Sequence, residues 1–118
     1  FDAKDRSIVI SGDTAYAPEL AAFARGADVL VHEVMYLPAL EGLLARNPDA
    51  KRLREHLVAS HTTPEEVGKV AKAAGVGTVV LTHFVPGDDP SITDAQWSDG
   101  VRAHYDGRVI VGRDLMEI

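Results

Sequence analysis

The chain has 118 residues, 46% of them hydrophobic, which suffices for one compact domain with its own core. Its formal net charge of -6 argues against broad, charge-driven binding to nucleic acid or acidic membranes, although a local basic patch remains compatible with it. It contains no cysteine, which excludes disulfides and thiolate metal sites, so any metal must be held by His, Asp or Glu.

The beginning of the chain predicts a strand and then a helix. Ser7–Ser11 is a short apolar run typical of a strand that is buried on both faces, and Asp13 follows it after a glycine. Pro18 suits the first turn of a helix in which Leu20, Phe23 and Ala24 share one face, and Gly26 ends it. The chain starts without an initiator Met and enters this strand directly, so we interpret it as a fragment of a longer protein.

A second buried strand is predicted over Asp28–Glu33, and it finishes in the polar residues His32 and Glu33. Beyond it, residues 38–57 carry leucines on both sides of an Asn47-Pro48 break. Because proline disfavours helix at the residue before it, this stretch predicts two short helices.

The clearest helix signal begins at Thr63. Thr63 and Glu66 have the capping-box spacing, Pro64 stands at the first helical position, and apolar residues follow at helical spacing up to Gly75. The sequence therefore predicts a helix between these two ends.

The last part of the chain predicts a third buried strand over Thr78–His83 and a helix over residues 93–105. Arg108–Gly112 and Leu115–Ile118 are expected to close as a hairpin. Strands alternate with helices along the chain, which indicates an α/β layered fold with crossover connections. No apolar run approaches the roughly 18 residues of a membrane span, and the composition fits a cytoplasmic protein.

Residues capable of chemistry stand at or near the predicted strand ends: Asp13, His32, Glu33 and His83. Open α/β sheets bind ligands beyond the carboxyl ends of their strands, so we expect these side chains at one edge of the sheet. A carboxylate there can bridge metal ions, and imidazole is a good zinc ligand. The same spacing also fits Asp13 as the cap of the next helix and His83 as a structural histidine.

His61 precedes the capped helix and is a candidate proton donor, although a hydrogen bond at the helix end explains it equally well. The carboxylate of Glu33 is suited to orient His61 or another ligand. A buried, paired glutamate would give the same pattern.

Four segments together carry a family resemblance: Ser11-Gly12-Asp13-Thr14, Val31-His32-Glu33, Ser60-His61-Thr62-Thr63-Pro64-Glu65-Glu66 and Leu81-Thr82-His83. In order and spacing they resemble the later motifs of the metallo-β-lactamase superfamily, in its ribonuclease Z and arylsulfatase-like branch. That branch shows Gly-Asp-Thr, His-Glu-Ala-Thr and His-Ser-Thr before a final His ligand. The resemblance implies that residues 1–118 form half of a metallo-β-lactamase-type αββα sandwich, namely the C-terminal part of the domain.

The resemblance also implies roles for single residues. Asp13 would bridge two zinc ions, with manganese or iron as alternatives, and His83 would bind one of them. His61 would protonate the leaving group with the help of Glu33. Two further residues would support the site: His32 and Thr14.

The family's His-x-His-x-Asp-His motif does not occur in the chain. We therefore expect the full-length protein to be a hydrolase that uses a metal-bound hydroxide. Its substrate would be a phosphodiester, such as RNA, or a small ester. The 118 residues alone are expected to be inactive, since zinc sites usually take about three or four protein ligands. The alternative is a non-catalytic half-fold that pairs with a second copy or docks to a partner, and a receiver-type or phosphatase domain ranks below it.

Overall fold

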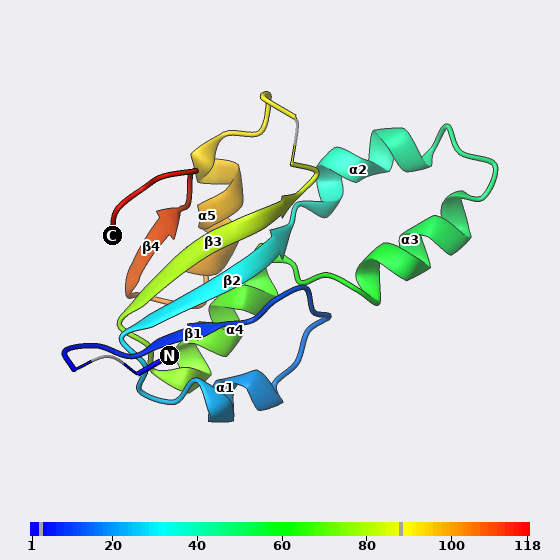
Figure 1. Cartoon of the computed structure of the whole chain (residues 1–118). Helices are drawn as coiled ribbons and strands as arrows, with labels where there is room; N and C mark the ends of the chain where they lie inside the picture. Colours follow the sequence, from blue (N-terminus) through cyan, green and yellow to red (C-terminus); the bar gives the residue numbers. More distant parts are fainter. Residues whose placement is uncertain (3, 88) are drawn as a thin grey trace.

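The computed structural model describes residues 1–2, 4–87 and 89–118, in which strands and helices alternate (Figure 1). The strands are β1 (Ile8–Ile10), β2 (Val29–Met35), β3 (Thr78–Val85) and β4 (Arg108–Val111). The helices are α1 (Glu19–Phe23), α2 (Leu37–Leu44), α3 (Ala50–Val58), α4 (Pro64–Ala74) and α5 (Asp94–Arg102). The predicted α/β architecture is confirmed.

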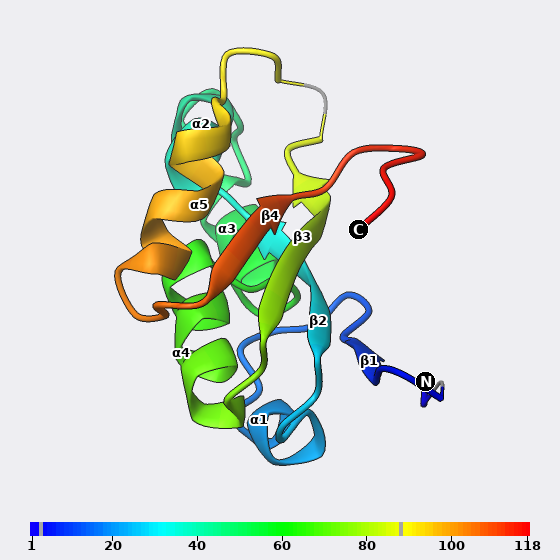
Figure 2. The same cartoon turned by 90° about the vertical axis from the view of Figure 1, so that its left-hand side faces the viewer.

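The sheet has four strands in the order β1-β2-β3-β4, and every neighbouring pair is parallel. Each connection between neighbouring strands must therefore cross over the sheet. Helices α1, α4 and α5 make these crossovers on the same face (Figure 2). The core lies between them and the sheet, and its strand residues are Leu30, Val34, Val79, Leu81 and Val109.

Helix α4 forms as its sequence predicts. The Glu66 carboxylate accepts a hydrogen bond from the Thr63 N–H at 2.9 Å, and Gly75 ends the helix in the left-handed conformation. Packing adds a constraint that the pattern does not show. A Cβ on Gly68 would lie 2.5 Å from the carbonyl oxygen of Val101, so glycine is required where α4 meets α5.

No helix of the described residues covers the other face of the sheet (Figure 2). The prediction of a first strand buried on both faces is wrong, because β1 is an edge strand and Ile10 on it is 55% exposed. Of the three residues predicted to share one face of the first helix, Ala24 is buried and Leu20 packs against the core, whereas Phe23 is 79% exposed. Phe23 lies beside β1, where it lines a hollow with Ile8, Val9 and Ile10.

The second and third strands run past their predicted ends. Strand β2 continues to Met35 and β3 to Val85, so His32, Glu33 and His83 lie inside strands and not at their ends. The predicted C-terminal hairpin is wrong as well. Strand β4 pairs in parallel with β3, and residues 115–118 form no strand.

Helices α2 and α3 confirm the two short helices predicted between Pro38 and Leu57. They pack on each other through a small second core and extend away from the sheet (Figure 1). The core consists of Met35, Leu40 and Leu44, with Leu53 and Leu57 against them. Within the described part of the chain, no helix is long and apolar enough to cross a bilayer.

Candidate functional site

The backbone of β3 is irregular at His83. In the register with β2, Thr82 lies opposite Glu33 and Phe84 lies opposite Val34, so His83 is an extra residue in a β-bulge. His83 has a positive φ of 43°, which costs a non-glycine residue of order 1 kcal/mol. The bulge lets Phe84 pack on Trp97, at 4.9 Å between ring centroids, while the imidazole of His83 stays free of the core.

Asp13 reaches His83 from the loop after β1. Gly12 takes a φ of 65°, which turns the chain at the end of the strand. The Asp13 Oδ2 then lies 3.4 Å from the His83 Nε2, and these side chains are 58% and 50% exposed. Two atoms of the kinds that bind metal ions are thus placed together in solvent.

A second pair lies beside the first and is buried. The His61 Nδ1 lies 3.3 Å from the Glu33 Oε2, with the two side chains 15% and 1% exposed. An ionised carboxylate only accepts hydrogen bonds, so the proton of the imidazole belongs on Nδ1. This leaves the His61 Nε2 for proton transfer. The other carboxylate oxygen, Glu33 Oε1, accepts the backbone N–H of Thr62 at 2.6 Å.

Thr62 joins the segments that carry the site. Its hydroxyl donates to the backbone oxygen of Thr14 at 2.6 Å, and its own carbonyl accepts the N–H of Met35 at 2.8 Å. Thr62 is fully buried, so each of these bonds is shielded from water. We did not predict a role for Thr62, and its position next to His61 was the available signal. Thr14, predicted as a supporting residue, takes part through its carbonyl group, since its hydroxyl donates to Ala15.

Burial changes the proton affinity of two site residues. It raises the pKa of Glu33 above its ordinary value, while the hydrogen bonds from Thr62 and His61 offset part of this shift. Burial lowers the pKa of His32, so this imidazole is neutral at neutral pH.

His32 does not join the cluster. Its Nδ1 lies 2.7 Å from the backbone oxygen of Glu33, to which it donates in the neutral form. Strand alternation directs His32 towards the helices and Glu33 towards the opposite face. The His32 side chain therefore supports the backbone of β2, and it forms no hydrogen bond with the side chains of Asp13, His61 or His83 within the described residues.

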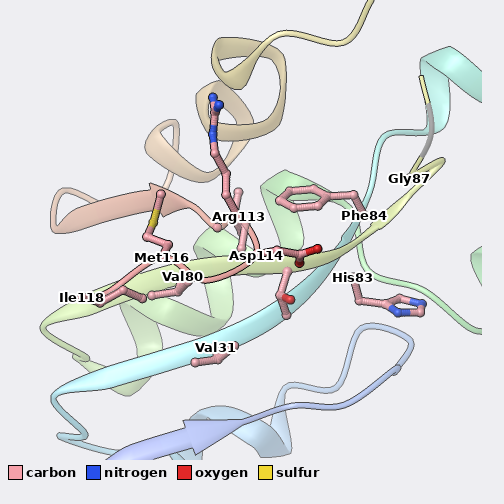
Figure 3. Close-up of a pocket in the computed structure, with 12 residues that line it drawn as sticks. Val31, Val80, His83, Phe84, Gly87, Arg113, Asp114, Met116 and Ile118 are labelled. Carbon is pink, nitrogen blue, oxygen red and sulfur yellow. The ribbon is translucent and has the colours of Figure 1, made fainter. Parts of the chain in front are cut away.

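The two pairs meet through their imidazoles. The rings of His61 and His83 are stacked, with centroids 5.8 Å apart and planes at 21°. A hollow on the open face of the sheet begins at His83, and Figure 3 shows Met116, Val80 and Ile118 grouped at its other end. The candidate metal ligand His83 therefore borders this hollow, and the candidate proton donor His61 stacks on His83.

Asp13 and His83 fit part of a metal site. A carboxylate oxygen and an imidazole nitrogen are ligand atoms for zinc and for other divalent ions. Residues 1–2, 4–87 and 89–118 contain no group of three or more His, Cys, Asp or Glu side chains arranged to hold a metal. Asp13 and His83 therefore supply two of the roughly three or four protein ligands that a tight zinc site usually needs.

Comparison with known proteins assigns the family. A family described as "Beta-lactamase superfamily domain" matches residues 1–84. The chain belongs to this family. It is 34% identical over 112 residues to a putative ribonuclease Z of Mycobacterium tuberculosis and 36% identical over 116 residues to a ribonuclease Z of Pseudomonas putida. These similarities confirm the resemblance to the ribonuclease Z branch.

These relatives are longer than the chain. The two alignments cover 95% and 93% of the chain but 47% and 32% of the respective relatives. The fold resembles that of YhfI, a metallo-β-lactamase fold protein of Bacillus subtilis, with a TM-score of 0.63 at 21% identity. That match covers 90% of the chain and 36% of YhfI, and it confirms the predicted fold class.

Proposed function

We propose that the protein containing this chain is a metal-dependent hydrolase that cleaves phosphodiester bonds in RNA. The observation that carries the proposal is the stacking of His61 on His83, because we assign proton donation to the first imidazole and metal binding to the second. The similarity to proteins named ribonuclease Z supports RNA as the substrate.

Asp13 and His83 would hold the metal together with ligands beyond the described residues. We propose zinc, with manganese and iron as alternatives, in a dinuclear site. When bound, such ions lower the pKa of water to about 7 and stabilise charge on phosphoryl oxygens. Both side chains are half exposed, so this chain leaves a substrate free access to them.

His61 would act as the general acid. Hydrolysis forms a bond from a water oxygen to phosphorus and breaks the bond from phosphorus to the leaving oxygen, which needs a proton. The imidazolium of His61 would give that proton from its Nε2. Glu33 would stabilise the imidazolium and fix the ring through the contact at Nδ1.

The test uses the full-length protein with labelled RNA and with a small activated phosphodiester. Chelation should abolish cleavage, and added zinc or manganese should restore it. His61→Ala should lower kcat on RNA by about 100- to 10,000-fold, the usual contribution of a general acid or base. It should cost less with the activated ester, whose leaving group needs no proton.

Two outcomes would contradict the proposal. A full-length protein that binds metal yet cleaves neither substrate would refute phosphodiester hydrolysis. Equal losses of kcat on both substrates in His61→Ala would refute the acid role while leaving the hydrolase assignment intact.

A further inference from the structure

Strand β3 carries His83 on the face opposite to the one that regular strand alternation predicts. Val79 and Leu81 of this strand lie in the main core between the sheet and the helices. Side chains of a strand alternate between its two faces, so an unbroken strand would direct His83 into the same core. His83 is instead half exposed, and its Nε2 lies 3.4 Å from the Oδ2 of Asp13.

The bulge explains this exchange of faces. Thr82 pairs with Glu33, Phe84 pairs with Val34, and the extra residue His83 lies between the two pairs. A shift of one residue moves the side chains that follow it to the other face of a strand. Phe84 therefore takes the core position opposite Val34, which His83 would occupy in an unbroken strand. Figure 3 shows His83 and Phe84 on opposite sides of the β3 ribbon.

Three aromatic side chains, here named the aromatic cluster, adjoin the bulge: Tyr36, Phe84 and Trp97. Trp97 lies at the centre, with its ring centroid 4.9 Å from that of Phe84 and 5.7 Å from that of Tyr36. It belongs to α5 and is 6% exposed, so this helix offers Phe84 a fixed surface. Tyr36 follows the end of β2, and its backbone N–H donates to the carbonyl of Val85 at 2.8 Å. The aromatic cluster thus joins α5 to both strands directly beyond the bulge.

The bulge needs this support because its backbone conformation is unfavourable. His83 has a φ of 43°, and a positive φ costs free energy in residues that carry a Cβ. Packing of Phe84 on Trp97 offsets this cost, since an aromatic pair stabilises a core beyond the area that it buries. Without that contact, a slip of one residue would relax the backbone and turn the imidazole of His83 away from Asp13.

We propose that Trp97 is a positioning residue of the metal site: it receives the ring of Phe84, and this contact keeps the imidazole of His83 beside Asp13. The inference rests on the proposed function for the presence of the metal. Trp97 belongs to the main core, so it acts on the metal only through Phe84 and the bulge. Loss of the contact should therefore weaken metal binding and leave the chemical step of a metal-loaded site unchanged.

The test measures zinc affinity in the full-length protein by competition with a chromophoric chelator. Trp97→Leu removes the ring that receives Phe84, and Trp97→Phe keeps an aromatic ring there. Val101→Ala is the control, because it opens a cavity at a fully buried position of the same helix, where α5 meets Gly68. Urea unfolding of each variant gives the loss of stability with which the affinities are compared. Phe84→Leu removes the other ring of the contact and replaces Trp97→Leu in the comparison if that variant does not fold.

Trp97→Leu should lower zinc affinity about 10- to 100-fold, the usual effect of groups that orient a metal ligand from behind. Trp97→Phe should keep the affinity within about threefold, because a phenyl ring can still pack on Phe84. Val101→Ala should be less stable but bind zinc unchanged. At saturating zinc, kcat of Trp97→Leu should return to within about twofold of the wild type, since excess ligand draws the protein back to its binding-competent form. Equal losses of zinc affinity in Trp97→Leu and Val101→Ala would overturn the inference, because affinity would then follow stability alone.

A second measurement needs neither metal nor activity. The stacked rings of His61 and His83 should give nuclear Overhauser effects between their protons in the metal-free wild-type protein. These effects should persist in Trp97→Phe and disappear in Trp97→Leu. If the wild-type protein binds no zinc, the proposed function fails, and this comparison still decides the inference. Persistence of the effects in Trp97→Leu would refute the inference, whatever the zinc affinities.

Discussion

The two pairs in the site differ in how far this chain encloses them. Glu33 and His61 are 1% and 15% exposed, and Thr62 binds the carboxylate of Glu33 from behind. Asp13 and His83 are 58% and 50% exposed and have each other as their ionic contact. The hydrogen bonds of the first pair are completed within the chain. The oxygen and nitrogen atoms of the second pair remain open to solvent, where they could bind a metal ion.

Replacement of His83, the proposed metal ligand, gives the largest expected effect. In the full-length protein, His83→Gly should lower metal affinity and activity by more than about 100-fold, because even groups behind a metal ligand contribute about 10- to 100-fold. Stability should not fall, since glycine adopts the positive φ of this position without strain. Metal titration, kcat and urea unfolding measure the three quantities.

His104→Ala is the matched control, since it removes an imidazole that lies outside the cluster. It should change neither metal affinity nor kcat. A His83→Gly protein that keeps its metal and its activity would show that the exposed pair is not a ligand pair. A large loss of stability would instead show that the imidazole of His83 is structural.

For the buried pair we expect the loss of stability to be larger than for the exposed pair. Glu33→Ala leaves the N–H of Thr62 buried without an acceptor, which should lower the free energy of unfolding by about 2 kcal/mol. Asp13→Ala should lower it by less than about 0.5 kcal/mol, because its side chain is exposed. Urea unfolding of both variants makes the comparison, and equal losses would contradict the contrast between the two pairs.

Features set by local rules were predictable from the sequence. The cap at Thr63 and the end at Gly75 define α4 in both prediction and structure. One contact between distant residues was also among the predictions: the family resemblance implied that Glu33 supports His61, and the structure brings the two side chains within 3.3 Å. The roles of these two residues in a reaction remain predictions.

Features set by distant contacts were not predictable. Polar residues were expected to end β2, yet the strand continues because Thr62 supplies an acceptor for the N–H of Met35. The bulge at His83 depends on the fit of Phe84 to Trp97, which local spacing does not encode. The pattern in residues 108–118 indicated two strands, but it did not contain the information that β4 pairs with β3.

The contrast between buried and exposed groups also predicts how stability depends on pH, because His32 is buried. Its folded pKa is lowered by burial, so the unfolded chain binds the proton more tightly. Stability is therefore complete above the unfolded pKa of about 6.5 and declines as the pH falls below it, by at most about 1.4 kcal/mol per pH unit. Urea unfolding at several pH values measures this decline.

His32→Gln should reduce this dependence, since glutamine does not titrate. Glu33 acts in the opposite direction, because its raised pKa makes stability decline as the pH rises above its unfolded value. Glu33 is present in both the wild-type protein and the His32→Gln variant, so its contribution largely cancels when their pH profiles of stability are subtracted. An unchanged pH profile in His32→Gln would show that His32 is not the group responsible.

The smallest expected effect tests whether the two pairs are independent. Thr62→Val removes the hydroxyl that binds the carbonyl of Thr14 and should cost about 1 kcal/mol, whereas Thr62→Ser keeps the hydroxyl and should keep that bond. Hydrogen exchange in residues 12–16 should accelerate with valine and not with serine. Since this loop carries Asp13, such a result would mean that the buried pair positions the exposed one through Thr62. Equal exchange in both variants would mean that the loop holds Asp13 without help from the buried pair.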